Sequence, residues 1–563
     1  MYAQRESEKI TRHFANFGDR QLHFRISGNG PPLLLLHQSP TSSAEMASQL
    51  EALAPEFTVI APDLPGYGLS DPLPVNEANM APFADAIVAF LDLLGLEQVC
   101  AYGFHTGAML AAELAYRHPQ RLTAAIIDGL VVLTEEERRD FMAKYFKKAP
   151  PQPEGGHLPF HWARIRDQLL FFPWYRKEHS VRMGIDLPPA AALQPYVLDL
   201  LRTRSKLGYR AAFAYPTAAR SAKWQIPVFL LNFAADPICH HVERVDAYPD
   251  CVTREILPDP DALTARATEI ARRHAPPSAD VPLRSAGDCT LSRLHEIVAT
   301  PFGGVHRIRR HGDPDRRPWL VLHEPGSAAR RWADMLADWP AGGSVIATDL
   351  QGHGETGNIH VDDFSAAAQA DVVAAATADL TQPVNVIGVG LSANIALEFA
   401  RRHPQRVAST ALLEPWLFDS AERAELERRY APPFTPQDYG QHLLEAWYWV
   451  RDGQLFWPWF DTRDARGIRD SELDPAWLHD RTVELLQSAD HLRSAVWALM
   501  DYDLESALKT HAGPMWAMSR GNSSPRSAAT KNAANMAADG RYEVLPADER
   551  AWGKRFCEAI ESP

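Results

Sequence analysis

The sequence predicts two tandem α/β domains, each with a mostly parallel β-sheet flanked by helices and with an inserted helical cap. Three observations predict this fold: an internal repeat, short strands that are apolar on both faces, and a helical insertion late in each copy. At 563 residues the chain is also long enough for at least two domains of ordinary size.

The internal repeat has a nearly constant offset. RHPQR occurs at residues 117–121 and again at 402–406, which is 285 residues later. Two further pairs of segments keep almost the same spacing, namely WARIRDQLLFFPWY at 162–175 with WYWVRDGQLFWPWF at 447–460, and VIAPDLPGYG ending at Gly68 with VIATDLQGHG ending at Gly354. Such an offset indicates tandem duplication of a whole domain.

The repeat sets the expected domain boundaries. We expect a first domain at residues 1–275 with its cap at about 131–223, and a second domain at 285–563 with its cap at about 416–511. Residues 276–284 begin with two prolines followed by small residues, which is typical of a linker. The fusion of two similar domains predicts an intramolecular pseudo-dimer with a two-fold relation between its halves.

Within the first copy, short apolar runs alternate with helical spacing. Strands are expected at 33–36, 58–61, 98–102, 122–127 and 228–232, and a helix at 83–94. Residues 134–222 break this rhythm with helical and aromatic sequence, which is why we expect a cap there. Thr134 and Glu137 have the spacing of a capping box and would open the first cap helix.

Four motifs of the first copy resemble the α/β-hydrolase superfamily, in particular the members with caps near epoxide hydrolases, haloalkane dehalogenases and proline iminopeptidases. They are an apolar strand ending in His37-Gln38, the D-x-P-G-x-G turn at 63–68, a strand–turn–helix at 101–116, and Asp236-Pro237 after a late strand. The resemblance covers residues 20–275 and, more weakly, 305–560. It implies an enzyme with a nucleophile on a sharp turn, G-x-Nuc-x-G, at a helix N-terminus.

The catalytic positions depart from that pattern. The turn of the first copy reads Gly103-Phe104-His105-Thr106-Gly107, so that a histidine stands at the nucleophile position. The turn of the second copy has Gly390 there, which offers no side chain. The superfamily's histidine after the last strand is replaced by acidic sequence in both copies, at 259–261 and 547–549. The acid position is Asp236 in the first copy and Ser523 or Asn522 in the second, so the second copy is expected to be inactive.

The first copy can still carry chemistry at His105. Histidine titrates near pH 6.5 and can therefore act as a base, an acid or a nucleophile. One rearranged site has Ser39 as nucleophile, His105 as base and Asp236 as its orienting acid. The resemblance implies that His37, Gln38 and Ser39 lie beside the turn, where the superfamily has its oxyanion loop. The alternative is that His105 is a relic in a binding pocket, with Ser39 shaping a loop.

The remaining candidate binding residues lie next to the turn and in the cap. Phe104 and Thr106 flank His105, and the cap carries Trp162 and Trp174, whose rings either form core or line an apolar or aromatic pocket. Arg166 pairs most simply with Asp167 and could alternatively anchor a substrate carboxylate. No metal site is expected, because His37, His105, Asp236 and His240 lack a diagnostic spacing.

Composition limits the other classes of function. A net charge of −14 without a basic block argues against nucleic acid or a membrane surface as partner, and no apolar run is long enough to span a bilayer. Five cysteines without a C-x-x-C pair are typical of reduced thiols in a cytoplasmic protein. Two hypotheses follow: a hydrolase or lyase that needs no cofactor and acts on a small, partly aromatic or apolar substrate in the first domain, or a non-catalytic binding protein.

Overall fold

The computed structural model describes residues 10–281, 290–332, 335, 338–340, 342–357, 363–468, 473–521 and 524–561. The chain divides into two compact units: unit 1 comprises residues 1–150 and 160–291, and unit 2 comprises residues 151–159 and 292–563. The whole of the expected linker at 276–284 lies before the division at 291/292, and its residues 282–284 lie outside the described ranges. Within those ranges, no helix combines the length and apolar character that a membrane span requires.

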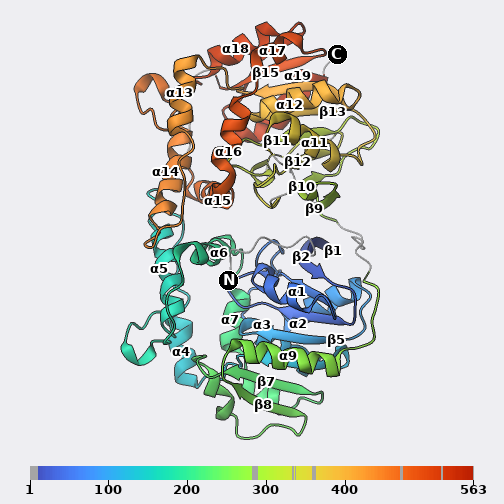
Figure 1. The fold of residues 1–563 in the computed structure, drawn as a ribbon, viewed down its shortest axis with the longest axis vertical. Coiled ribbons are helices and arrows are strands. Elements are labelled where there is room, and N and C mark those ends of the chain that lie inside the picture. The colour runs from blue at the N-terminus through green and yellow to red at the C-terminus, as the bar shows by residue number, and fades with distance from the viewer. Residues whose placement is uncertain are drawn as a thin grey trace. The chain divides into compact units, whose positions relative to one another are not determined.

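Unit 1 is built on an eight-stranded sheet (Figure 1). Its order is β1-β2-β4-β3-β5-β6-β7-β8, with antiparallel pairs from β1 to β4 and parallel pairs from β4 to β8. The strands are β1 (Thr11–Phe17), β2 (Arg20–Ser27), β3 (Pro32–Leu36), β4 (Thr58–Pro62), β5 (Val99–Phe104), β6 (Leu122–Asp128), β7 (Val228–Phe233) and β8 (Val252–Leu257). Every residue of β3 and β4 is buried, because helices cover both faces of a parallel sheet.

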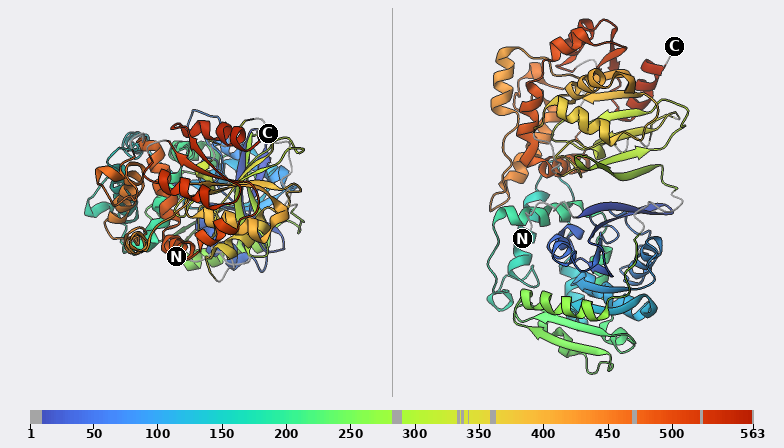
Figure 2. Two further views of the ribbon diagram at one scale, coloured as in Figure 1. Left: turned by 90° about the horizontal axis from the view of Figure 1, so that it is seen from above. Right: turned by 45° about the vertical axis from the view of Figure 1, so that its right-hand side comes forward.

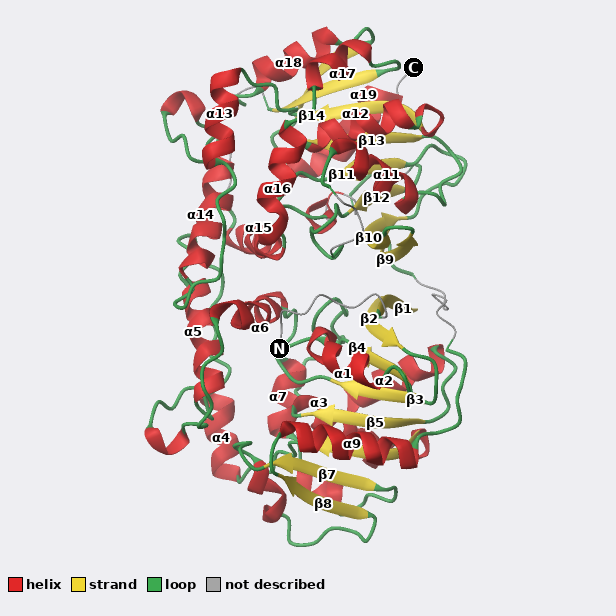
Figure 3. Ribbon diagram, viewed as in Figure 1, coloured by secondary structure: helices red, strands yellow, loops and turns green. Residues whose placement is uncertain are grey.

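The helices of unit 1 fall into two groups. α1 (Ala47–Leu53), α2 (Ala81–Leu93), α3 (Thr106–Arg117) and α9 (Pro260–His274) accompany the strands, and α9 buries Leu263, Ala267 and Ile270 along one side. The segment between β6 and β7 holds α4 (Glu135–Lys144), α5 (His157–Leu170), α6 (Ala190–Arg202), α7 (Leu207–Ala214) and α8 (Thr217–Ser221). Figure 3 shows α4 and α7 beside the ends of the strands. The capping box at Thr134 and Glu137 is confirmed.

Unit 2 repeats this plan with a second eight-stranded sheet, in the order β16-β15-β14-β13-β11-β12-β10-β9. Its strands are β9 (Arg293–Thr300), β10 (Gly303–Arg310), β11 (Trp319–Leu322), β12 (Val345–Thr348), β13 (Val384–Val389), β14 (Val407–Leu413), β15 (Met515–Arg520) and β16 (Gly540–Leu545). The sheet has the usual twist between neighbouring strands (Figure 2). The expected fold of two tandem α/β domains is therefore confirmed.

The described helices of unit 2 follow the same pattern as those of unit 1. α11 (Ala366–Ala376), α12 (Ser392–Arg402), α18 (Ser527–Met536) and α19 (Trp552–Glu561) accompany the strands, whereas α13 (Ser420–Arg429), α14 (Gln441–Leu455), α15 (Pro475–Gln487), α16 (Ala489–Met500) and α17 (Leu504–Thr510) lie between β14 and β15. α6 and α15 both have 13 residues and stand 285 residues apart, so the repeat extends into the helical insertions.

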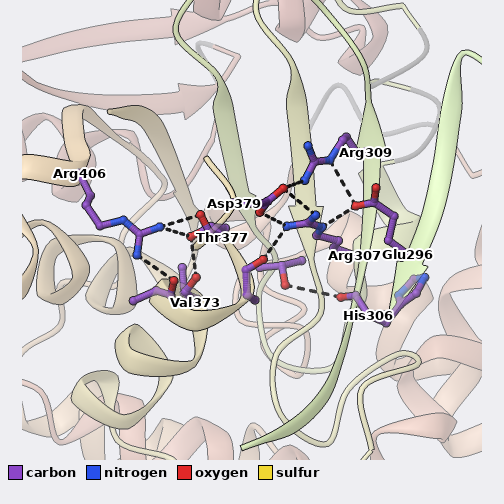
Figure 4. A network of polar contacts seen from close by, with 11 residues as sticks. Glu296, His306, Arg307, Arg309, Val373, Thr377, Asp379 and Arg406 are labelled. Carbon is purple, nitrogen blue, oxygen red and sulfur yellow. Dashed lines mark hydrogen bonds and ion pairs between the residues drawn. The ribbon is translucent and has the colours of Figure 1, made fainter. Parts of the chain in front are cut away.

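A polar network ties the first hairpin of unit 2 to the end of α11 (Figure 4). Arg307 on β10 contacts Glu296 on β9 and forms two hydrogen bonds of 2.7 and 3.0 Å with Asp379. Arg406 donates to the backbone oxygens of Ala374 and Thr377, both at 2.7 Å. Bidentate guanidinium–carboxylate pairs are directional, so they fix the hairpin relative to the helix.

One buried carboxylate in each unit holds the D-x-x-x-x-G turn. Asp63 accepts hydrogen bonds from His23 Nδ1 at 2.9 Å and from the backbone N–H groups of Ser43 and Leu69 at 2.8 Å. Burial would raise its pKa, but His23 and the nearby cations outweigh burial, and the pKa of Asp63 lies well below its usual range. Asp349 takes the same position in unit 2, with His306 Nδ1 at 2.7 Å.

We predict that Asp63→Asn destabilises the protein, because an amide NH₂ would face donors that need an acceptor. The substitution also removes the charge that faces Arg25 Nη1 at 3.8 Å, and breaking a buried ion pair costs about 3 kcal/mol or more in the free energy of unfolding. The control is Asp259→Asn, since Asp259 caps the exposed start of α9 and asparagine caps equally well. Urea unfolding measures both variants, and an equal loss of unfolding free energy in the two would contradict the prediction.

Candidate functional site

The site begins at a strained turn between β5 and α3. His105 is the single residue between Phe104, which ends the strand, and Thr106, which begins the helix. Its backbone has φ 46° and ψ −101°, a conformation that residues other than glycine rarely adopt. Of the described residues other than glycine, His105 and Glu414 have positive φ. Strain of this kind is concentrated at functional sites.

Glycines make this turn possible. A Cβ on Gly103 would lie 2.1 Å from the backbone oxygen of Gly107, and a Cβ on Gly107 would lie 2.0 Å from that of Leu36. Gly129, which follows β6, faces the imidazole itself, and a Cβ there would lie 2.3 Å from His105 Cδ2. Both glycines of the motif and the glycine on the next strand therefore leave space for the turn and its ring.

The imidazole of His105 is held from both sides. Nε2 lies 3.0 Å from Asp236 Oδ2, and Nδ1 lies 3.2 Å from Gln38 Oε1. Asp236 is itself anchored, because its Oδ1 accepts from the N–H of Ile238 at 2.8 Å. The ring of Phe104 stacks on the imidazole with centroids 4.2 Å apart. The expected partnership of His105 with Asp236 thus has hydrogen-bond geometry.

Glu45 orients the amide of Gln38. Gln38 Nε2 donates to Glu45 Oε1 at 2.5 Å, and Thr41 Oγ1 donates to Glu45 Oε2 at 2.5 Å. Because the amide nitrogen faces Glu45, the amide oxygen faces His105 and accepts from its Nδ1. Both ring nitrogens of His105 therefore donate hydrogen bonds, and this pattern is that of the imidazolium.

The charges around His105 favour the same state. Burial opposes the imidazolium, but the carboxylates of Asp236, Asp128 and Glu45 outweigh burial and raise the pKa of His105 above 6.5. Burial would raise the pKa of Asp236, yet His105 lowers it. Burial raises the pKa of Glu45 and that of Asp128 to about 7 each. The site thus holds one cationic imidazole and two carboxyl groups that titrate near neutrality.

Strand order explains why these residues meet. β3, β5, β6 and β7 are neighbours in the parallel part of the sheet, and Gln38, His105, Asp128 and Asp236 lie at or just beyond their carboxyl ends. Ligand sites of open α/β sheets form at this edge. Asp128 accepts a hydrogen bond of 2.6 Å from Tyr102, and its backbone oxygen accepts from the N–H of His105.

A cavity of about 300 Å³ opens over this edge in unit 1. Its polar floor includes Gln38, Glu45, His105 and Asp236, and its walls are largely apolar and aromatic. The aromatic and aliphatic wall residues include Tyr145, Ile165, Phe172, Tyr196, Tyr209 and Phe213. A concave, mostly apolar cavity with a few convergent polar groups is the usual form of a small-molecule site.

Several residues chosen from the sequence have other contacts. Ser39 Oγ donates to Tyr67 at 2.9 Å rather than to His105, so the structure does not join the proposed Ser39–His105 pair. His37 is buried and bridges a loop, with Nδ1 on the backbone oxygen of Gln38 and Nε2 accepting from Leu64 N–H. Thr106 accepts from Ser39 N–H at 3.3 Å and lines the cavity together with Phe104.

The residues named from the sequence in the expected cap are not among those that line the cavity. Trp174 is buried and donates to the backbone oxygen of Tyr145, and Trp162 is also buried. Arg166 lies 3.9 Å from Asp167 at the surface. Conversely, sequence reasoning missed Glu45 and Asp128. Each lies in sequence with an ordinary secondary-structure pattern, and nothing in the sequence indicated that either residue lies next to His105.

Among the residues that the structure describes, the corresponding positions of unit 2 lack this arrangement. Gly390 occupies the turn with φ 56°, and Ser392 is buried with its Oγ donating to the backbone oxygen of His323 at 2.6 Å. Asn522 and Ser523 lie outside the described residues. Ser524 precedes Pro525 as Asp236 precedes Pro237, and its Oγ donates to Glu414.

Comparison with known proteins agrees with this fold. Residues 31–249 and 320–462 match the alpha/beta hydrolase fold family, which together is more than half of the chain. The chain belongs to this family.

Individual relatives match shorter stretches of the chain. A soluble epoxide hydrolase of Corynebacterium sp. is 36% identical over 110 residues, 20% of this chain and 38% of that protein. A fluoroacetate dehalogenase of Burkholderia sp. is 32% identical over 161 residues, 26% of this chain and 52% of that protein. The solved structure of a putative epoxide hydrolase from Pseudomonas aeruginosa has 22% identity and a TM-score of 0.35, covering 48% of this chain and 98% of that one. The chain thus spans at most about half the length of these two curated relatives.

We predict that Asp236 sets the titration of His105. In a ¹⁵N or ¹³C NMR titration, the pKa of His105 should lie above 6.5 in the wild type and fall in Asp236→Asn, which removes the opposing charge but keeps a side chain of equal size. The matched control is Asp92→Asn, which removes an exposed carboxylate at the end of α2, before β5 begins. An unchanged titration in Asp236→Asn would contradict the ion pair.

The same pair links stability to pH. The folded pKa of His105 is raised, so its contribution is complete below pH about 6.5 and is lost as the pH rises through the folded value. The folded pKa of Asp236 is lowered, so its contribution is lost as the pH falls below about 3.9 toward the folded value. The pair therefore stabilises unit 1 most at mildly acidic pH.

Proposed function

We propose that unit 1 is a hydrolase that acts on a small, apolar or partly aromatic substrate without a cofactor, and that unit 2 is catalytically inactive. The observation that carries this proposal is the placement of His105. It stands on the strained turn where the family carries its nucleophile, is paired with Asp236, and faces a cavity that also contains Glu45.

The proposed chemistry uses His105 as an acid and Glu45 as a base. Glu45 takes a proton from a water molecule, whose oxygen forms a bond to the electrophilic carbon of the substrate. The bond from that carbon to its leaving oxygen breaks, and the oxygen takes the Nδ1 proton of the His105 imidazolium, which is donated to Gln38 in the free site. General acid–base groups of this kind contribute on the order of 100- to 10,000-fold each, and they work best when their pKa values lie near the working pH.

The cavity supports the substrate class. Its volume of about 300 Å³ suits a small molecule, and its tyrosine and phenylalanine walls suit an apolar or aromatic group. Two relatives are named as an epoxide hydrolase and a dehalogenase, which supports hydrolysis as the reaction class. For unit 2, the lack of a side chain at Gly390 and the internal hydrogen bond of Ser392 support the absence of an activated nucleophile.

A non-catalytic binding protein is the second candidate. The residues after β8 favour this candidate, because the superfamily resemblance implies a histidine there and this chain has none at that point. There Asp259 accepts from the N–H of Ala262 and caps α9, so that position carries a structural residue. In this case the cavity of unit 1 would bind its ligand without turnover.

Kinetics of His105→Asn test the proposal. The probes are phenyl acetate, an ester, and styrene oxide, an epoxide. We predict that the wild type turns over at least one of them, and that His105→Asn lowers kcat by about 100-fold or more because proton transfer is lost in the transition state. Ser392→Ala in unit 2 is the control and should stay within a few-fold of wild type. If both probes bind saturably without turnover, the binding-protein reading replaces the enzyme.

We also predict a bell-shaped pH profile with its maximum near neutrality. Activity should rise with pH as Glu45, with a pKa of about 7, loses its proton, and fall as His105, with its raised pKa, loses its own. Glu45→Gln should lower the maximum and remove the rising limb. A rate in the wild type that climbs steadily to alkaline pH would show instead that neutral His105 acts as the base.

A further inference from the structure

Unit 2 has a cavity of its own at the corresponding edge of its sheet. Its volume is about 100 Å³. The lining is unusual in combining guanidinium groups with indole rings, and it includes Arg331, Arg481, Arg520, Arg526, Trp449, Trp457, Trp459 and Trp477. The described lining of the unit 1 cavity contains no arginine.

The four arginines stand at positions that line the cavity of unit 1. The short helix 329–332 corresponds to 43–46, which aligns Arg331 with Glu45. α15 corresponds to α6, which aligns Arg481 with Tyr196. Both Glu45 and Tyr196 line the unit 1 cavity. The backbone of the site is thus the same, while two of its lining side chains have become basic.

The other two arginines follow the same rule. β15 corresponds to β7, so Arg520 at the end of β15 aligns with Phe233 at the end of β7. Arg526 follows Ser524-Pro525 as Ile238 follows Asp236-Pro237. Phe233 and Ile238 also line the unit 1 cavity. A cavity that gains a cation at each of four matched wall positions is suited to a different ligand.

These guanidinium groups have donors to spare. In the part of the chain that the structure describes, Arg526 Nη1, Arg520 Nε and Arg481 Nε are buried without a hydrogen-bond partner. The Arg526 side chain is 9% exposed, and its guanidinium lies 4.1 Å from the ring centre of Trp457. Burial lowers the pKa of Arg481 to about 10. Buried donors without acceptors are costly, and an anionic ligand would supply those acceptors.

The neighbouring carboxylates occupy only part of this donor set. Glu414 accepts from Arg526 Nη2 at 2.7 Å, and Glu549 accepts from Arg331 Nη2 at 2.6 Å. The guanidinium of Arg520, in contrast, stays 3.8 Å from Glu414 and 4.0 Å from Glu549. Glu324 also lines the cavity, and Glu484 lies 2.7 Å from Arg481. Charges are therefore balanced around the cavity, so affinity would come from directed donors and not from a net positive field.

Glu414 adds an independent sign of function. It has φ 49°, is buried, and lies where unit 1 has Gly129. Its carboxylate accepts hydrogen bonds from Ser524 Oγ, from the backbone N–H of Arg520 and from the guanidinium of Arg526. The last of these bonds fixes Arg526 at the cavity wall. Strain at a buried charged residue persists when the surrounding structure maintains it, and it is concentrated at ligand sites.

We propose that the cavity of unit 2 binds a small aromatic carboxylate. The carboxylate would accept hydrogen bonds from Arg526, Arg520 and Arg481, and the aromatic ring would lie against the indoles of Trp457 and Trp449. Guanidinium groups bind carboxylates with directed, often bidentate hydrogen bonds, and indoles provide flat apolar surface. This site is separate from the proposed hydrolytic site and requires no turnover in either unit.

The test is isothermal titration calorimetry of the full chain with benzoate. The expected result is saturable binding that persists in His105→Asn, with benzamide at least about 10-fold weaker because it lacks the charge. Absence of benzoate binding, or equal binding of benzamide, would overturn the proposal. Loss of binding in His105→Asn would place benzoate in unit 1 and overturn it as well.

Variants that restore the unit 1 side chains locate the site. Arg481→Tyr and Arg520→Phe should each weaken benzoate binding by about 10-fold or more. Removing Arg526 alone would leave Glu414 unpaired, so the double variant Glu414→Gly with Arg526→Ile is used, because unit 1 carries that pair on the same fold. Arg541→Gln, on the exposed side of β16, is the control. Thermal unfolding verifies folding, and unchanged affinity in all three cavity variants would overturn the proposal.

Discussion

The site of unit 1 depends on one backbone constraint, the positive φ of the residue between β5 and α3. This conformation lifts a side chain off the strand and over the start of the helix, and it requires that strand and helix pass closely. Gly103 and Gly107 satisfy that requirement, since a Cβ on either would overlap backbone oxygens. His105 adopts this strained conformation although it is not a glycine, and hydrogen bonds to Asp236 and Gln38 hold its ring in one orientation.

A histidine at this position occupies the nucleophile's place on the turn and also contacts the acid, two positions that the superfamily fills with separate residues. Its imidazole extends from the turn far enough to reach Asp236 directly, at 3.0 Å, so no second histidine is needed to contact the acid. The consequence is electrostatic. Asp236 and Gln38 accept from both ring nitrogens, and the site therefore favours a cationic imidazole over the neutral base that a serine nucleophile would require.

The sequence predicted the fold more completely than it predicted the site. Periodicity and the repeat located the strands, and the G-x-H-x-G turn and Asp236 led to the His105 pair. The positions of Glu45 and Asp128 near His105 could not be predicted from the sequence. They depend on strand order and on the loop after β3, which no local pattern encodes. The residue types of Ser39, Trp162 and Trp174 suggested functional roles that their contacts do not match. The hydroxyl of Ser39 donates to Tyr67, and both indole rings are buried and are not part of the cavity lining.

The two units use the same two adjacent backbone positions in opposite ways. In unit 1 the turn after β5 carries His105, and the residue after β6 is Gly129, because any Cβ there would overlap the imidazole. In unit 2 the turn carries Gly390, and the residue after β14 is Glu414, which now bears the strained positive φ. Removal of the ring leaves room for a side chain on the neighbouring strand. Once a carboxylate occupies that position, Arg526 at one of the matched wall positions can pair with it, so the glycine in the turn and this arginine of the cavity wall are consequences of one steric exchange.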